Sequence, residues 1–154
     1  MPKQVIDPEK LVSQAYAIAS RDGISALSVR KVATACGIAV GSVYGYFPTK
    51  ADLTAAVLTR FFDENLSDEF CAVRPGERFT SYVRRFREAL CAVRSDMSVD
   101  WFTEMRRLPC KEHAALEEVR GPMLAHMERG LVRVLEMDEA VDRSRLVGPM
   151  SAEA

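Results

Sequence analysis

The chain has 154 residues, 48% of them hydrophobic, which is enough to bury a core as one compact body or as a small head on a larger one. Its formal net charge is −1, but residues 1–53 carry six Lys or Arg against four Asp or Glu, whereas residues 54–154 carry 15 against 18. This composition excludes a disordered or fibrous chain. The charge bias alone does not establish a nucleic-acid-binding protein.

The cysteines give no sign of a disulfide framework. They lie at irregular spacing and form no CxxC pair: Cys36, Cys71, Cys91 and Cys110. The N-terminus has no charged and then apolar leader with a small-residue cleavage site. We therefore expect a reducing, cytoplasmic location, and we interpret all four cysteines as small buried hydrophobic residues.

The N-terminal residues predict a first capped helix. Asp7 can cap a helix that begins with Pro8 and runs to about Asp22, where Gly23 supplies a left-handed residue. Its apolar residues recur at helical spacing: Leu11, Ala15, Ile18 and Ala19.

Two shorter helices are predicted next. Ser28 can cap the first of them, with Arg30 and Lys31 facing outward, and Gly37 makes the turn to the second, over residues 39–46. Pro48 cannot continue the helical hydrogen bonding, so the chain must restart there. The residues expected to hold these helices at a fixed crossing angle are Val32, Ala33, Ile38, Val43 and Phe47.

A fourth helix is predicted to begin after Thr49, which forms the pattern of a capping box with Asp52. It continues to about Phe70 and is long enough to connect a head to a body. Its apolar stripe consists of Leu53, Val57, Leu58, Phe61 and Phe62.

The remaining sequence also has helical periodicity. A helix is predicted from about Glu77 to Arg94, with an apolar stripe of Phe79, Val83, Phe86, Leu90 and Val93. Asp96 then opens a helix that Pro109 ends, and Gly121-Pro122 kinks or divides a further stretch from Lys111 to about Met137. No segment shows the strict alternation of a half-buried strand, so the predicted fold is all-α.

The segment from Ser28 to Lys50, together with the L-x3-A-x2-I pattern of the capped first helix, resembles the DNA-binding domain of the TetR family of transcriptional regulators. The segment reads SVRKVATACGIAVGSVYGYFPTK. The resemblance covers roughly residues 8–58, over which a dozen positions agree in order and spacing. It implies an N-terminal three-helix helix-turn-helix head, joined through a fourth helix to a C-terminal helical bundle. The expected domains are residues 1–53, which bind DNA, and residues 54–154, which hold an effector and pair two chains.

The chemistry of the same segment favours contact with a duplex. A helix that enters a major groove about 12 Å wide needs short side chains toward the bases. Val40, Gly41, Ser42 and Gly45 supply them, and Val40 can pack on a thymine methyl group. Lys50 opens the next helix, where its ammonium and the helix N-terminus both favour a phosphate.

The resemblance assigns further contacts. It places Tyr44 and Tyr46 where the family grips the DNA backbone, and it makes Arg30 the candidate for direct base reading; the alternative for Arg30 is pairing with a neighbouring acid. The complete predicted set of DNA-contacting residues is Ser28, Arg30, Lys31, Val40, Gly41, Ser42, Tyr44, Gly45, Tyr46, Thr49 and Lys50.

Other classes of protein fit the sequence less well. The 18 uncharged residues between Lys31 and Lys50 superficially fit a membrane span with small-residue packing, but three glycines, a proline and several polar side chains argue against it. Catalytic and nucleotide-binding motifs are absent, so neither an enzyme nor a cofactor is expected. Cys110-x2-His113, with His126 further on, forms an incomplete zinc pattern, and no metal is expected.

The C-terminal part contains candidates for an effector pocket. They are apolar, soft or polar-tipped residues: Phe62, Phe86, Met97, Trp101, Phe102, Met105, Met123, His126 and Met127. Met97, Trp101 and Met105 recur every four residues, which predicts one helical face. An ordinary core stripe has the same pattern, so both interpretations stay open. Such a lining suits a small, largely apolar organic molecule.

The resemblance implies a ligand-responsive repressor that binds a near-palindromic operator as a homodimer. One departure concerns the end of the chain: family members commonly continue with two long helices that build the dimer interface, whereas the sequence after Met137 offers only residues 138–147 and a short tail. Either the chain is truncated or it pairs through another surface, such as residues 111–147. The alternative function is a truncated or degenerate family member that acts through protein pairing without binding an operator itself.

Overall fold

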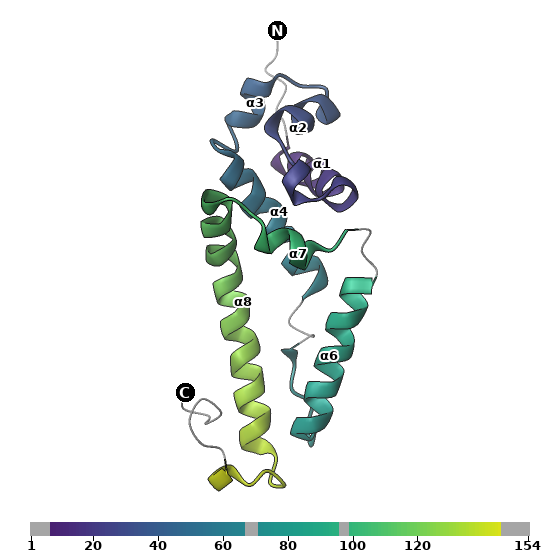
Figure 1. Cartoon of the computed structure of the whole chain (residues 1–154), viewed down its shortest axis with the longest axis vertical. Coiled ribbons are helices and arrows are strands. Elements are labelled where there is room, and N and C mark those ends of the chain that lie inside the picture. Colours follow the sequence, from purple (N-terminus) through teal and green to yellow (C-terminus); the bar gives the residue numbers. More distant parts are fainter. Residues whose placement is uncertain (1–6, 67–70, 96–98, 146–154) are drawn as a thin grey trace.

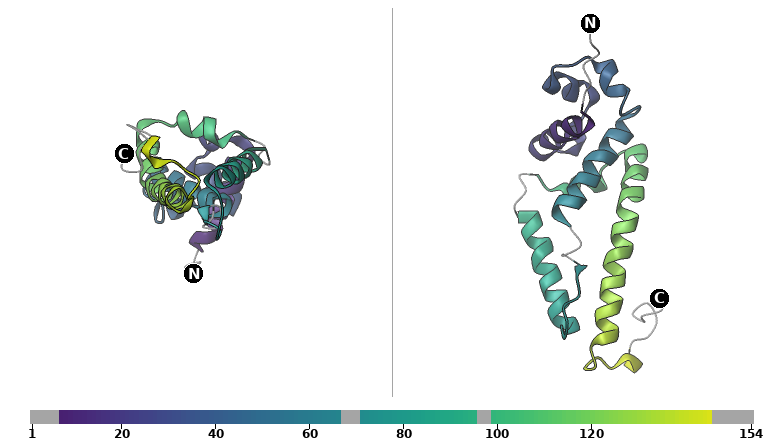
Figure 2. Two further views of the ribbon diagram at one scale, coloured as in Figure 1. Left: turned by 90° about the horizontal axis from the view of Figure 1, so that it is seen from below. Right: turned by 180° about the vertical axis from the view of Figure 1, so that it is seen from behind.

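The computed structural model describes residues 7–66, 71–95 and 99–145. All regular secondary structure within these ranges is helical, which confirms the predicted all-α fold. The molecule is elongated, with a head of three N-terminal helices at one end and two longer helices side by side toward the other (Figure 1). A second view from behind shows the same arrangement (Figure 2).

The head consists of α1 (Pro8–Asp22), α2 (Val29–Cys36) and α3 (Val40–Tyr44). A short 3-10 helix, η1 (Ile24–Ala26), joins α1 to α2. Helix α3 is shorter than the predicted span of residues 39–46, and the N–H groups of Tyr46 and Phe47 both donate to the Val43 carbonyl just after it.

Local capping fixes where the head helices begin and turn. The Asp7 carboxylate accepts a hydrogen bond from the Glu9 N–H at 3.0 Å, and the Ser28 hydroxyl accepts one from the Lys31 N–H at 3.2 Å. Gly37, with φ +67°, adopts the left-handed conformation that closes α2. These three predictions from the sequence are confirmed.

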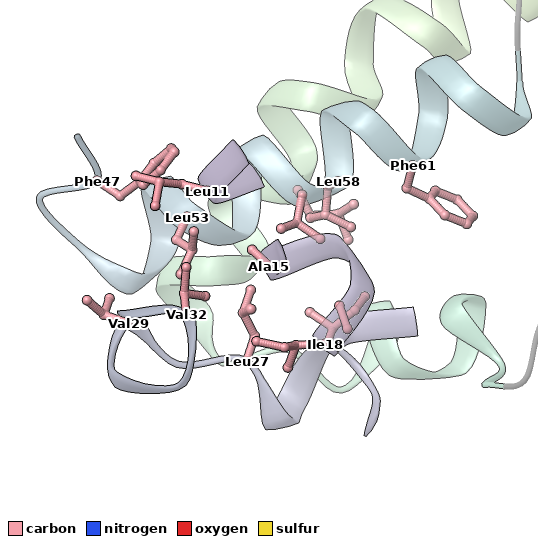
Figure 3. Close-up of a cluster of buried hydrophobic side chains, with 14 of the residues drawn as sticks. Leu11, Ala15, Ile18, Leu27, Val29, Val32, Phe47, Leu53, Leu58 and Phe61 are labelled. Carbon is pink, nitrogen blue, oxygen red and sulfur yellow. The ribbon is translucent and has the colours of Figure 1, made fainter. Parts of the chain in front are cut away.

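One hydrophobic cluster fills the head and continues along α4 (Lys50–Asn65). Figure 3 shows side chains of α1, α2 and α4 meeting in this cluster. The apolar stripes predicted for α1 and α4 are all buried. Among the residues predicted to set the crossing angle, Ile38 is half-buried against the cluster, and the others are buried.

Thr49 and Asp52 form the predicted capping box at the start of α4. The Thr49 hydroxyl accepts a hydrogen bond from the Asp52 N–H at 3.2 Å, and the Asp52 carboxylate accepts one from the Thr49 N–H at 2.8 Å. The helix ends at Asn65 rather than near Phe70. Residues 67–70, over which the prediction continued, lie outside the described ranges.

The body contains α6 (Phe79–Ser95), α7 (Trp101–Arg106) and α8 (Cys110–Met137), followed by a 3-10 turn, η2 (Arg143–Arg145). Helix α8 is continuous through Pro122, so the prediction of two separate helices is wrong. Packing of α8 against both α4 and α6 keeps this segment helical although Pro122 has no N–H to donate.

Helix α7 begins later than predicted. The Asp100 carboxylate accepts a hydrogen bond from the Thr103 N–H at 3.2 Å and so caps the helix, whereas the predicted start was Asp96. Val99 and Asp100 are not helical, so α7 does not reach back toward Met97, which lies outside the described ranges. Of the single helical face predicted for three residues, Trp101 and Met105 lie buried on α7, and Met97 lies outside the described ranges.

The inward face of α6 also differs from the prediction. Val83 is 38% exposed, whereas Tyr82 is fully buried. A Cβ at Gly130 of α8 would lie 2.6 Å from the Tyr82 hydroxyl oxygen and 2.9 Å from the Cys71 carbonyl oxygen. The close approach of α6 to α8 thus requires glycine at position 130. Burial raises the pKa of the Tyr82 hydroxyl.

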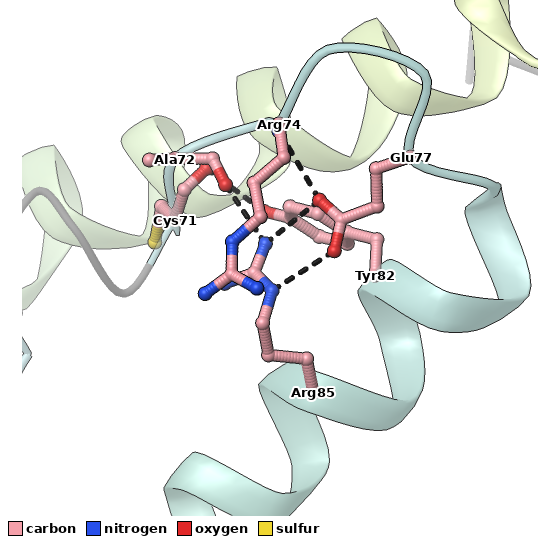
Figure 4. A network of polar contacts seen from close by, with 6 residues as sticks. All are labelled: Cys71, Ala72, Arg74, Glu77, Tyr82 and Arg85. Atoms are coloured by element: carbon pink, nitrogen blue, oxygen red, sulfur yellow. Dashed lines mark hydrogen bonds and ion pairs between the residues drawn. The ribbon is translucent and has the colours of Figure 1, made fainter.

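A polar network ties the start of α6 to the segment before it (Figure 4). Arg85 donates through Nε to Glu77 at 2.9 Å and through Nη2 to the Ala72 carbonyl at 2.8 Å. The Tyr82 hydroxyl donates to the Cys71 carbonyl at 3.1 Å. The hydrogen bond from the Arg85 guanidinium lowers the pKa of the Glu77 carboxyl, because it stabilises the charged form.

The interpretation of all four cysteines as buried residues is wrong for two of them. Cys71 is buried and Cys36 is half-buried, whereas Cys91 and Cys110 are exposed. Cys91 lies on the outer side of α6 and Cys110 is the first residue of α8, where no core lies over them. None of the four forms a disulfide bond within the described ranges.

Candidate functional site

Helix α3 lies at the head end of the molecule (Figure 1), and its side chains differ in exposure. Val43 is fully buried. At Gly41, a Cβ would have no heavy atom within 4 Å, so this position faces open space. Tyr44 and Tyr46 are 49% and 41% exposed. A slim exposed ridge flanked by two tyrosines matches what a groove-binding helix needs.

The other predicted residues of α3 are less open. Val40 is half-buried and packs against the hydrophobic cluster, and Ser42 is also half-buried. Gly45 is exposed, but a Cβ there would lie 3.3 Å from the Ser42 carbonyl oxygen, which limits the side chains this position accepts. The structure thus leaves Gly41 as the widest opening on the ridge.

Basic and hydroxyl residues surround α3. Arg30 and Lys31 are exposed on the first turn of α2. The hydroxyls of Ser28 and Thr49 accept hydrogen bonds from backbone N–H groups of the helices they cap. Their first role is therefore to fix the starts of α2 and α4, beside the exposed ridge.

Lys50 has a partner in the body of the protein. Its Nζ lies 3.7 Å from the Oε1 of Glu112, in the first turn of α8. The Lys50 side chain is 39% exposed and that of Glu112 is 11% exposed. The residue predicted to contact a phosphate is thus already paired with a carboxylate, which no local pattern in the sequence indicates.

Helix α7 forms a second link between the head and the body. Glu104 accepts hydrogen bonds from the Ser25 hydroxyl at 2.6 Å and from the Ser25 N–H at 3.3 Å. Trp101 stacks on Phe61 of α4, with ring centroids 4.5 Å apart and planes at 9°. It also packs on Tyr16 of α1, at 5.4 Å. A shift of α7 would therefore act directly on both α4 and the head.

A cleft with a volume of about 300 Å³ lies among α4, α6, α7 and α8. Its apolar lining comes from Phe62, Leu66, Leu90, Phe102, Met105, Leu116, Met123, Leu124 and Met127. Three basic side chains complete it: Arg106, His113 and Arg120. A neighbouring hollow shares Phe62, Leu66 and Met123 with the cleft and adds His126.

The structure places eight of the nine predicted pocket residues in three groups, and the ninth, Met97, lies outside the described ranges. Phe62, Phe102, Met105, Met123 and Met127 line the cleft, and His126 lines the neighbouring hollow. Two others do not line it: Trp101 is fully buried, and Phe86 is half-buried and stacks beside Tyr82 at 6.2 Å. The basic residues were missed because charged residues on a helix usually belong to a solvated face.

Neither a metal centre nor a membrane span is found in the described ranges. Within residues 7–66, 71–95 and 99–145, no three His, Cys, Asp or Glu side chains gather into a group that could hold a metal ion. Cys110 and His126 are 16 residues apart on one helix, roughly 24 Å along its axis. None of the helices in these ranges combines the length and apolar character needed to cross a bilayer.

The comparisons with known proteins define the class of the head. Residues 11–57 match the family model described as bacterial regulatory proteins, tetR family. An HTH-type transcriptional repressor KstR from Mycolicibacterium smegmatis is 38% identical over 55 residues, which are 36% of this chain and 27% of that protein. KstR from Rhodococcus jostii is 36% identical over 55 residues, which are 36% of this chain and 26% of that protein.

Two solved structures share the fold over most of the chain. A transcriptional regulator from Rhodococcus sp. Rha1 has a TM-score of 0.66 at 22% identity, over 86% of this chain and 71% of that one. A TetR transcriptional regulator from Legionella pneumophila has a TM-score of 0.58 at 19% identity, over 92% of this chain and 78% of that one.

The head is a helix-turn-helix domain of the type found in bacterial regulators. Over residues 11–57, this head matches the TetR family of bacterial regulators. The chain matches only about a quarter of the length of these curated relatives.

Proposed function

We propose that this protein is a TetR-type transcriptional repressor that binds a near-palindromic operator as a homodimer and releases it when a small organic effector binds. The observation that carries the proposal is the exposed ridge of α3, with open space at Gly41 and exposed tyrosines at positions 44 and 46. The assignment as a repressor is supported by the name of the KstR relatives. We propose a cytoplasmic location and a role other than catalysis.

The proposed DNA contacts divide into positioning and reading. Tyr44, Tyr46 and Lys50 hold phosphates, which supplies affinity without sequence information. Arg30 reads a base edge from the start of α2, and Ser42 exchanges a hydrogen bond with a second one. The ridge at Gly41 lets the backbone of α3 approach the floor of the groove.

The proposed domains meet along α4. We propose residues 1–53 as the DNA-binding domain and residues 54–154 as the domain that holds the effector and pairs two chains. In a dimer, the two heads meet successive major grooves about 34 Å apart. An effector that favours another separation of the heads weakens operator binding, and the operator weakens effector binding by the same factor.

Helix α7 supports a route for this coupling. Phe102, Met105 and Arg106 line the cleft. Two other residues of the same helix contact the head: Trp101 packs on Tyr16, and Glu104 accepts hydrogen bonds from Ser25. We propose that an effector which moves α7 changes the position of the head through these contacts.

The pairing of Lys50 with Glu112 supports a second element of the mechanism. A DNA phosphate and the Glu112 carboxylate compete for the Lys50 ammonium, because this group cannot pair closely with both at once. We propose that the free protein holds Lys50 against α8 and that operator binding transfers it to a phosphate.

Selection of bound duplexes from a random pool tests the proposed function. The expected result is one enriched, near-palindromic sequence whose half-sites are centred about one helical turn apart. Sedimentation of the enriched complex should give two chains per duplex. Enrichment of no sequence, together with no binding at low salt, would overturn the proposal.

A further inference from the structure

Building on the proposed function, we propose that the cleft among α4, α6, α7 and α8 recognises an amphipathic organic anion, with an apolar body and a carboxylate head. The apolar body contacts the phenylalanine, leucine and methionine side chains of the lining. The carboxylate head lies between Arg106 and Arg120. This assignment goes beyond a merely apolar effector, because it fixes the charge of the ligand.

The charged side chains that line the cleft are all basic. Arg106, His113 and Arg120 line the cleft, and none of its lining residues is acidic. Arg106 donates to the Thr103 hydroxyl at 3.1 Å, a neutral partner. The Glu117 carboxylate contacts Arg120 at 2.7 Å and His113 at 3.4 Å but does not line the cleft. The two arginines outweigh this carboxylate, so the cleft favours an anion.

Arg120 supplies a second and independent observation. Its Nε is buried and has no hydrogen-bond partner among the described residues. A buried N–H donor without an acceptor is costly, so a rotation of the Arg120 side chain that brings this N–H to a ligand carboxylate removes that cost. The Nη2 of the same guanidinium is held by Glu117 at 2.7 Å, which fixes the orientation of the plane. The Arg120 side chain is 40% exposed, so its guanidinium is held by Glu117 and is also accessible to a ligand.

The neighbouring hollow has the opposite character. It is lined by Asp63 and Glu118, and it shares the apolar residues Phe62, Leu66 and Met123 with the cleft. An anion therefore has one favourable end of the combined space and one unfavourable end. This asymmetry sets the direction of the bound molecule, with its charged head toward α7 and Arg120.

Three ten-carbon probes of different charge test the assignment: sodium decanoate, 1-decanol and decylammonium chloride. Trp101, the single tryptophan of the chain, is the reporter, because it stacks on Phe61, whose ring lies 6.1 Å from the cleft residue Phe102. Tryptophan fluorescence is titrated on the full chain without DNA. Decanoate should bind about tenfold more tightly than decanol, as expected for one added charged hydrogen bond, and decylammonium should bind most weakly.

Charge variants give the matched controls. Arg106→Met and Arg120→Met keep much of the apolar stem, and each should remove most of the preference for decanoate without changing the affinity for decanol. Arg120→Lys should retain part of the preference. Arg107→Met removes a neighbouring exposed charge that does not line the cleft, and it should change nothing. Circular dichroism melting checks that each variant is folded.

Equal affinities for the three probes, no binding of any probe, or a preference that survives both methionine variants would overturn the assignment. The outcome is separable from the fate of the proposed function, because DNA binding is measured on the same samples. Anion preference without any effect on operator affinity overturns the ligand-responsive repressor and leaves the anion site. Operator binding without anion preference overturns the anion site and leaves the proposed operator binding.

Discussion

Neutralising Glu112 should strengthen DNA binding, although Glu112 is on the body of the protein and not on the proposed DNA face. In the free chain its carboxylate lies 3.7 Å from the Lys50 ammonium. Glu112→Gln keeps the size of the side chain and removes the charge. Lys50 can then bind a phosphate without first breaking an ion pair.

The magnitude follows from the geometry and the exposure of the pair. At 3.7 Å, two unit charges attract by about 1 kcal/mol in water and by several-fold more at the effective dielectric constant near a protein surface. Since the Lys50 side chain is 39% exposed, solvent screening reduces the net value to about 0.5 to 1 kcal/mol. Transfer of that energy to DNA binding predicts about two- to fivefold tighter binding per head.

Fluorescence anisotropy with the selected duplex measures this effect. Glu128→Gln, an exposed glutamate on the same helix, is the control for net charge. It lies 16 residues further along α8, roughly 24 Å from position 112 and so beyond the screening length at physiological salt. Lys50→Ala should weaken binding to all DNA and lower the salt slope by about one. The reasoning is refuted if Glu112→Gln binds DNA no better than Glu128→Gln, or if it still strengthens binding when Lys50 is alanine.

Four further variants test single features of the structure. Gly41→Ala should leave the free energy of unfolding unchanged or raise it by up to about 1 kcal/mol, because a Cβ there meets open space. The same variant should lower DNA affinity in the anisotropy assay. Gly37→Ala should instead destabilise the head, because Gly37 has a φ of +67°. The Arg85 contact lowers the folded-state pKa of Glu77, so the stabilisation it gives is present above the unfolded pKa of about 4.3 and is lost as the pH falls through the folded value. Glu77→Gln should therefore lower the free energy of unfolding by about 2 to 4 kcal/mol near pH 7. Urea titrations at several pH values should also show a smaller loss of stability in acid for this variant than for the wild type. Thr54→Val should raise the free energy of unfolding by about 1 kcal/mol, because the buried Thr54 hydroxyl has no hydrogen-bond partner within the described ranges; a melting temperature below that of the wild type would contradict this.

The head could be predicted from the sequence because its signals are local. Asp7, Ser28 and Thr49 are within three residues of the N–H groups they cap, and Gly37 closes a helix by its own conformation. The helical spacing of apolar residues then identifies the buried faces of α1 and α4 without knowledge of their partners.

The body was predicted less well because tertiary contacts decide its details. Pro122 stays within a helix that packs against both α4 and α6. Tyr82 rather than Val83 is buried because Gly130, 48 residues later, leaves room for its ring. Position alone cannot reveal such long-range fits.

The DNA-binding face and the cleft also differ in how far the sequence could predict them. The exposed residues around α3 follow from one continuous segment, and their openness could be judged from the pattern. The Lys50–Glu112 pair and the arginines of the cleft join positions far apart in the chain, so only the folded arrangement brings them together.

Amide chemical-shift mapping with the selected duplex tests the central claim most directly. Titration of the DNA into the isotope-labelled chain should perturb the first turn of α2, residues 40–46 and the start of α4, and should leave the far half of α8 unchanged. Perturbations confined to α6 and α8, or none at any salt concentration, would contradict the account.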